Sequence, residues 1–293
     1  EQGFTFKDIT NIFRTNLSRS GLLKLEKSGK IPEASRVQRG NSPYRYWNVS
    51  ELPLIGAQLS KLPSTGKTEI VTVYISKGGG SFKSTFVWNF SRWLGLHGKK
   101  VLVVPLDQQL NQSFLNNLDN SFETVAETKA FLPGISDVLM KGTPIKKTII
   151  PTTLPNIHII PESPILIELE LWLSSQNFRE QLIAKAIEPI KKEYDVIIFD
   201  TAPSWGNLVS NAVIASSHLI SPIGVDLMSY KTLPVFLQMI KKFCAAAKHN
   251  FDNILLVPGF VDNSRLCQQV LGAYQQSYPD IFTISNIRRS TFV

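Results

Sequence analysis

Six short runs of almost unbroken apolar sequence constrain this chain more than any other feature. They are rich in Val and Ile, are separated by helix-length segments, and occupy residues 70–75, 100–106, 156–161, 194–200, 218–224 and 253–260. Strands that lie between two layers of helices in a parallel sheet have this composition, because both of their faces are buried. The alternation therefore predicts an α/β domain with a doubly wound, mostly parallel sheet.

The first 66 residues follow a different pattern, and a linker containing Pro, Ser and Gly separates them from the strands. Apolar residues at helical spacing predict one helix around residues 6–13. A second helix is expected to begin after Ser18, which can cap it, and to end at Gly29. Two short helices joined by a turn are typical of a helix-turn-helix.

A Gly-Asn-Ser-Pro sequence at residues 40–43, flanked by Arg39 and Arg45, predicts the tip of a hairpin after the second helix. The run "LLKLEKSGKIP" followed by "YRYW" resembles the winged-helix domains of the MerR type. We therefore expect two domains: a small α-rich winged helix-turn-helix domain over residues 1–66, and the α/β domain over residues 67–293.

The positive charge of the chain is concentrated near its start. The net charge is +8 at pH 7, and the first 66 residues contain ten Lys or Arg against five Asp or Glu. A basic segment of this kind suits a polyanion, and for a helix-turn-helix the expected polyanion is operator-type DNA. The candidate contacts on or beside the second helix and the hairpin are Arg19, Lys24, Lys27, Arg39 and Arg45.

The composition also indicates the cellular compartment in which the protein is expected to work. No apolar run approaches the ~18 residues that cross a bilayer, so we expect no membrane partner. Cys244 and Cys267 are the only cysteines, and both lie in helix-like sequence. A disulfide framework is therefore not expected, and a reducing cytoplasm fits the chain best.

The segment "SKGGGSFKST", residues 76–85, lies between the first predicted strand and a helix-like stretch. Glycines there let backbone N–H groups approach phosphate oxygens, and the following helix directs its positive end toward them. Asp107 and Asp200 each stand at the end of a later predicted strand. Because ligands bind beyond the carboxyl ends of parallel strands, the pattern predicts a nucleotide site there.

Together, "KGGGSFKST", "LDQQ", "FDTAPSWG", "SNAVIASSHLISPIG" and "NIRRSTFV" resemble the ParA family of partition ATPases, which use a deviant phosphate loop. The resemblance covers roughly residues 68–293, and the preceding basic domain resembles the larger, autoregulating plasmid type. It implies ATP and Mg²⁺ as cofactors, a homodimer, binding to nonspecific DNA, and slow hydrolysis stimulated by a ParB-like adaptor. A location in the cytoplasm, on the nucleoid, is also implied.

The resemblance assigns roles to individual residues. Lys77 matches the signature lysine that reaches the partner subunit's nucleotide, and Asp107 matches the carboxylate that positions the attacking water. Asp200 matches the Walker B residue, which with Ser84 would hold magnesium. The basic C-terminal element that binds nonspecific DNA corresponds to Arg288 and Arg289. The predicted nucleotide-binding loop comprises Lys77, Gly78, Gly79, Gly80, Ser81, Phe82, Lys83, Ser84 and Thr85.

The loop departs from the family pattern in one way that leaves two alternatives. Lys77 and Lys83 are six residues apart, one more than usual, and Phe82 stands where a glycine normally precedes the lysine. If one residue is inserted, Lys83 is the phosphate-loop lysine. If none is inserted, Phe82 takes the lysine position and the loop is crippled. We favour the insertion, because "KST" keeps the charge and the hydroxyl in the required order.

A second departure concerns the strand before Asp107. The family usually has Asp-x-Asp at this strand end, whereas Pro105 takes the first place here, so hydrolysis is expected to be slow. A nucleotide-gated transcriptional repressor with vestigial hydrolysis is therefore an alternative. A membrane-associated relative resembling MinD is another, but it would need a C-terminal amphipathic helix, and the sequence ends at "RRSTFV".

Overall fold

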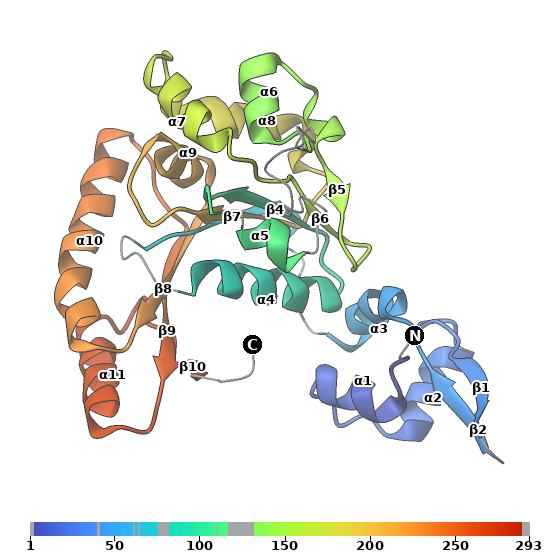
Figure 1. Ribbon diagram of the computed structural model, residues 1–293. Coiled ribbons are helices and arrows are strands. Elements are labelled where there is room, and N and C mark those ends of the chain that lie inside the picture. Colours follow the sequence, from blue (N-terminus) through green and yellow to red (C-terminus); the bar gives the residue numbers. More distant parts are fainter. Residues whose placement is uncertain are drawn as a thin grey trace, which may run out of the picture.

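The computed structural model describes residues 3–39, 42–60, 62–63, 65–75, 82–109, 111–116 and 132–288. The described chain forms one eight-stranded sheet and a separate two-stranded one. Strand order in the large sheet is β10-β9-β8-β3-β7-β4-β6-β5, and within the described residues every neighbouring pair is parallel except β5 and β6. The predicted mostly parallel α/β sheet is confirmed (Figure 1).

Each of the six apolar runs coincides with a strand to within two residues at either end. These are β3 (Glu69–Val73), β4 (Val101–Leu106), β6 (Ile157–Ile159), β7 (Val196–Thr201), β8 (His218–Gly224) and β9 (Asn253–Val261). Two further strands were not predicted, β5 (Ile150–Pro151) and β10 (Ile287–Arg288). Each of these is two residues long and lies at an edge of the sheet, so neither has the apolar run that marks a buried strand.

Helices cover both faces of the sheet. They are α4 (Lys83–Leu96), α5 (Asn111–Leu115), α6 (Ile135–Lys141), α7 (Leu166–Ser174), α8 (Leu182–Lys191), α9 (Asn207–Ala215), α10 (Leu227–Ala246) and α11 (Arg265–Ser277), with 3-10 turns at Ile145–Lys147 and Arg179–Gln181. Alternate residues of β4 face opposite layers: Val103 packs with α4, whereas Leu102 and Val104 pack with α7 and α8. This burial on both faces explains the apolar character of the strands.

The N-terminal segment has a core of its own. It contains α1 (Phe6–Ile12), α2 (Arg19–Lys27), the antiparallel pair β1 (Ser35–Arg39) and β2 (Ser42–Tyr46), a 3-10 turn at Val49–Glu51, and α3 (Leu52–Leu59). Ile9, Leu22, Trp47 and Ile55 are among its buried residues. Ser18 caps α2 by accepting a hydrogen bond from the Gly21 N–H, and Gly29 follows the helix at φ +68°. Both predicted boundaries of this helix are confirmed.

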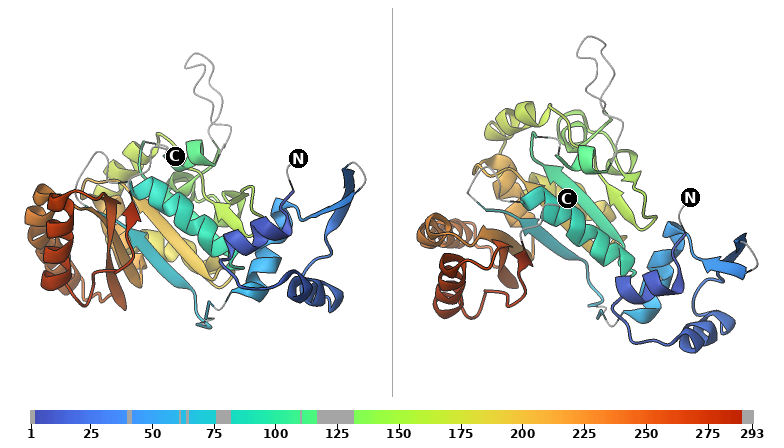
Figure 2. Two further views of the ribbon diagram at one scale, coloured as in Figure 1. Left: turned by 90° about the horizontal axis from the view of Figure 1, so that it is seen from below. Right: turned by 60° about the horizontal axis from the view of Figure 1, so that its bottom comes forward.

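The N-terminal segment lies against the far end of α4 (Figures 1 and 2). Leu96, in the last turn of α4, packs on the N-terminal core, and the rings of Phe13 and His97 meet edge to face with centroids 5.5 Å apart. The Lys99 ammonium donates a hydrogen bond to the carbonyl of Pro63 at 2.8 Å. One helix therefore connects this segment with the strand ends where the nucleotide site is predicted.

Among the described residues, no helix combines the length and the apolar character needed to cross a membrane.

Candidate nucleotide site

The candidate site lies where α4 begins, beside the carboxyl ends of β4 and β7. Five residues of the predicted loop, Lys77, Gly78, Gly79, Gly80 and Ser81, lie outside the described residues. The structure describes the remainder of the loop, from Phe82 to Thr85, and both strand-end carboxylates.

Lys83 is the first residue of α4 and is only 6% exposed. Burial lowers the pKa of its ammonium, and the negative charges of Asp200 and Asp107 act in the opposite direction. A buried lysine beside two carboxylates, at the start of a helix that follows a strand, is suitably placed to bind phosphate. The geometry thus supports Lys83 as the phosphate-loop lysine, in agreement with an inserted residue.

Phe82, which stands where a glycine normally precedes the lysine, has a backbone conformation that glycine adopts without strain. Its φ of +42° lies in the left-handed region, which costs a non-glycine residue roughly 1–2 kcal/mol. The ring packs on β9: it meets the ring of Phe260 edge to face at 4.9 Å. A Cβ added to Gly259 would lie 1.9 Å from the tip of the Phe82 ring. This packing explains how the loop accommodates a phenylalanine.

Asp200 lies near the end of β7 and is 1% exposed. Burial raises the pKa of its carboxyl to about 6, against the opposing effect of hydrogen bonds from the side chains of Gln112 and Ser84. The amide of Gln112 donates to Asp200 Oδ2 at 2.7 Å. In the described part of the structure, Asp200 Oδ1 is buried without a hydrogen-bond partner.

Asp107 directly follows β4 and is 7% exposed. Its Oδ1 accepts a hydrogen bond from the backbone N–H of Gln109 at 3.2 Å. Its negative charge contributes to the raised pKa of Asp200, so the two carboxylates belong to one electrostatic site. The structure therefore brings Lys83, Asp107 and Asp200 together, because β4 and β7 are neighbours in the sheet and both end beside the start of α4.

Gln112 is a site residue that the sequence analysis missed. It lies in α5 and is 1% exposed. Its amide donates to the carbonyl of Ser84 at 2.8 Å as well as to Asp200. Its position five residues after Asp107 was the available signal, because a helical turn beginning beyond a strand end brings such a residue back toward the site.

The described oxygen atoms suit magnesium. Mg²⁺ prefers oxygen ligands and keeps several waters when it binds beside phosphates. The site offers the Ser84 hydroxyl and the Asp200 carboxylate, and it contains two buried oxygens without partners among the described residues, Asp200 Oδ1 and Gln112 Oε1. Such atoms are costly to leave unsatisfied, so the donor set fits a hydrated divalent cation.

Replacing Asp200 with asparagine is expected to stabilise the free protein at about pH 7. A carboxyl whose folded pKa is raised stabilises the fold below its unfolded pKa, and this contribution is lost as the pH rises through about 6. The gain from removing the charge should be on the order of 2–3 kcal/mol and should shrink as the pH is lowered to about 5. Thermal unfolding without nucleotide or Mg²⁺ measures it; a destabilised variant at both pH values would contradict the buried-charge account.

The predicted DNA contacts divide into two groups. Arg19, Lys24 and Lys27 are exposed on α2, and Arg288 is exposed on β10. Arg45 instead forms an ion pair with the largely buried Glu26, which also accepts a hydrogen bond from the Ala34 N–H. That pair ties β2 to α2 and offsets the charge of Arg45. The side chain of Arg39 and all of Arg289 lie outside the described residues.

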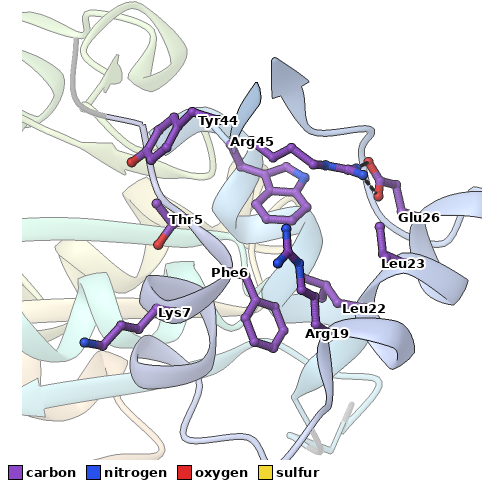
Figure 3. Close-up of a pocket in the computed structure, with 10 residues that line it drawn as sticks. Thr5, Phe6, Lys7, Arg19, Leu22, Leu23, Glu26, Tyr44 and Arg45 are labelled. Carbon is purple, nitrogen blue, oxygen red and sulfur yellow. Dashed lines mark hydrogen bonds and ion pairs between the residues drawn. The ribbon is translucent and has the colours of Figure 1, made fainter. Parts of the chain in front are cut away.

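A pocket of about 320 Å³ lies between α1, α2 and β2 (Figure 3). Phe6 and Leu22 contribute apolar walls, and the exposed Arg19 lines it beside them. The Glu26–Arg45 pair lies on the opposite side of the pocket from Lys7. Arg19 therefore both lines this pocket and is exposed to solvent.

Comparison with known proteins agrees with this geometry. The model of a family described as an AAA domain, AAA_31, matches residues 68–253. The cell division protein PomZ of Myxococcus xanthus is 26% identical over 220 residues, covering 75% of this chain and 66% of its own length. The chromosome-partitioning ATPase Soj of Treponema pallidum is 30% identical over 177 residues, covering 60% and 64%. These matches span about two thirds of the length of the relatives.

Solved structures show the same fold. Cobyrinic acid a,c-diamide synthase from Mycobacterium smegmatis, determined with an ATP analogue and magnesium, superposes with a TM-score of 0.65 at 22% identity. The match covers 76% of this chain and 88% of that one.

The parallel sheet and the lysine–carboxylate site at its strand ends are those of an α/β protein with a P-loop NTPase-like fold. More narrowly, the chain belongs to the AAA_31 family, and the proteins similar to it include a chromosome-partitioning ATPase and a cell division protein. The resemblance to the ParA-like family is confirmed by these relatives together with the family model, which covers residues 68–253. Residues 1–67 lie outside the family match.

Proposed function

We propose that this chain is a ParA-type partition ATPase that binds ATP with Mg²⁺ and hydrolyses ATP slowly. The convergence of Lys83, Asp107 and Asp200 at the start of α4 carries the proposal. Two comparisons support it. The Soj relative is a chromosome-partitioning ATPase, and the structural neighbour was determined with an ATP analogue and magnesium. Phosphate release from Mg-ATP, measured alone and with random duplex DNA, tests it; a protein that binds no ATP would overturn it.

Each site residue has a distinct role in this proposal. Lys83 donates to the phosphates, Ser84 and Asp200 hold the magnesium with its waters, and Asp107 positions the attacking water. When bound, magnesium neutralises phosphate charge as the transfer proceeds. Lys77 reaches the nucleotide of a second copy in an ATP-bound homodimer. A ParB-like adaptor stimulates hydrolysis and releases the dimer from DNA in the cytoplasm.

The N-terminal segment is proposed as a winged helix-turn-helix domain for operator-type DNA. Two helices, a turn and an antiparallel hairpin follow one another in the order expected for this domain. Lys24 and Lys27 are three residues apart on α2 and share one exposed face. This proposal places the domain boundary at residue 66. It also assigns Arg288 and Arg289 to the binding of nonspecific DNA.

The two DNA-binding surfaces are expected to be separable. Replacing Arg19, Lys24 and Lys27 with alanine should remove operator preference while ATP-dependent binding to random DNA persists. The double change Arg288→Ala, Arg289→Ala should do the reverse, and each lost phosphate contact should reduce the log–log salt slope by roughly 0.9. Binding of each variant to operator and random duplexes, with ATP and with ADP over a salt series, measures both effects.

If both variants lose both modes to the same extent, the two-surface proposal fails. The N-terminal segment would then be better interpreted as a basic dimerisation element. Arg36→Ala serves as a matched control, because Arg36 is an exposed arginine on β1 that lies within 3.9 Å of Glu33. Its removal should leave both binding modes close to those of the parent protein.

A nucleotide-gated repressor is the second candidate function, and one observation favours it. Pro105, which stands where the family usually has an aspartate, pairs in register with Asp200 across β4 and β7. The site therefore has one carboxylate fewer than the family pattern, which favours slow or vestigial hydrolysis. A protein that releases no phosphate with Mg-ATP, DNA and its adaptor, yet binds operator DNA according to the nucleotide present, would favour the repressor.

A further inference from the structure

Gln112 is buried in a polar site, and both described hydrogen bonds of its side chain go to other elements of that site. The side chain is 1% exposed. Its amide nitrogen donates to the Ser84 carbonyl at 2.8 Å and to Asp200 Oδ2 at 2.7 Å. Gln112 thereby links three elements: α5, the first turn of α4, and the end of β7.

The two strand residues that pair with Asp200, Val73 on β3 and Pro105 on β4, offer its carboxylate no side-chain hydrogen-bond donor. The residue that pairs with it on β4 is Pro105, which has no side-chain donor and no backbone N–H. The hydrogen bonds that lower the pKa of Asp200 come from the side chains of Gln112 and Ser84. Without the amide of Gln112, one of these two would be lost, and the orientation of the carboxylate would be less well defined.

Among the described residues, the amide oxygen of Gln112 has no hydrogen-bond donor. Gln112 Oε1 and Asp200 Oδ1 are both buried without hydrogen-bond partners in the described part of the chain. Leaving a buried polar atom unsatisfied costs about 1–3 kcal/mol. These two oxygens lie beside the Ser84 hydroxyl, on side chains that are hydrogen-bonded to each other. They suit a ligand that donates hydrogen bonds and carries positive charge. A hydrated divalent cation has both properties.

We propose that Gln112 is a positioning residue for magnesium: its amide nitrogen orients Asp200 and the start of α4, and its amide oxygen accepts a hydrogen bond from a metal-bound water. This inference rests on the proposed binding of Mg-ATP at this site. It adds a residue that neither the phosphate-loop pattern nor the strand-end carboxylates indicate. Gln112 acts through Asp200, Ser84 and water rather than on the reacting phosphate.

The test compares nucleotide affinity with and without the metal. A fluorescent ATP analogue is titrated into the parent protein, Gln112→Ala and Gln112→Met, in Mg²⁺ and in EDTA. Loss of an outer-sphere partner typically weakens metal affinity 10–100-fold, so the gain in affinity that Mg²⁺ gives the parent should shrink by roughly this factor in both variants. Affinity in EDTA should stay close to that of the parent. Electron paramagnetic resonance of Mn²⁺ with ADP measures metal affinity directly and should show the same loss.

The variants and outcomes separate this inference from the proposed function. Gln112→Met keeps the length of the side chain but removes both its donor and its acceptor, so it remains informative if Gln112→Ala does not fold. Gln108→Ala, at an exposed glutamine in the same segment, is the matched control and should behave like the parent. A parent that binds no nucleotide overturns the proposed function. The role of Gln112 alone is overturned if the parent binds Mg-ATP tightly and Mg²⁺ raises the nucleotide affinity of Gln112→Met as much as that of the parent. It is also overturned if Gln112→Met loses as much nucleotide affinity in EDTA as in Mg²⁺.

Discussion

Replacing Lys83 with alanine should weaken ATP binding by at least about 100-fold, which would be undetectable in an ordinary titration. The Lys83 ammonium is buried beside Asp107 and Asp200 at the start of α4. Its removal deletes the charge that would contact the phosphates and leaves the two carboxylates to repel them. Calorimetric titration with ATP and Mg²⁺ measures the loss, and thermal unfolding establishes that the variant is folded.

Phe82→Gly is the matched change in the adjacent residue. Glycine adopts the φ of +42° without strain, which offsets the loss of the ring contact with Phe260. ATP binding should therefore be kept or improved. If Lys83→Ala binds ATP as tightly as the parent protein while Phe82→Gly gains nothing, the inserted register is wrong and Lys83 is not the phosphate-loop lysine.

Replacing Asp107 with alanine should separate binding from hydrolysis. Asp107 directly follows β4, is 7% exposed, and is oriented by the backbone N–H of Gln109. A carboxylate that positions or activates the attacking water contributes typically 10²–10⁴-fold to the rate, so turnover should fall by at least about 100-fold. ATP affinity should be nearly unchanged, because Lys83 and the loop that contact the phosphates remain.

Single-turnover phosphate release with and without DNA, together with ATP titration, measures the two effects of Asp107→Ala separately. The variant should stay on random DNA in the presence of ATP, because hydrolysis no longer releases the dimer. Turnover equal to that of the parent protein would show that Asp107 does not position the water. Parallel loss of ATP binding would instead place Asp107 among the residues that hold the nucleotide.

Most of the α/β fold was predictable because its causes are local. A strand buried on both faces must be apolar along its whole length, so each of the six central strands appears as one run, from residues 70–75 to residues 253–260. Asp107 and Asp200 were recognisable for a related reason: a charged residue at the end of such a run lies at the carboxyl end of its strand, where ligands bind. The Ser18 cap and Gly29 likewise depend only on residues close in sequence.

Other features depend on contacts between residues distant in the chain. The spacing of Lys77 and Lys83 left two registers open, and the position of Lys83 between carboxylates from two strands favours one of them. The ring of Phe82 packs on Gly259, the amide of Gln112 meets Asp200, and Arg45 is paired with Glu26 rather than free. No local pattern encodes these pairings, because burial and hydrogen bonding between such residues arise only once the strands and helices have packed together.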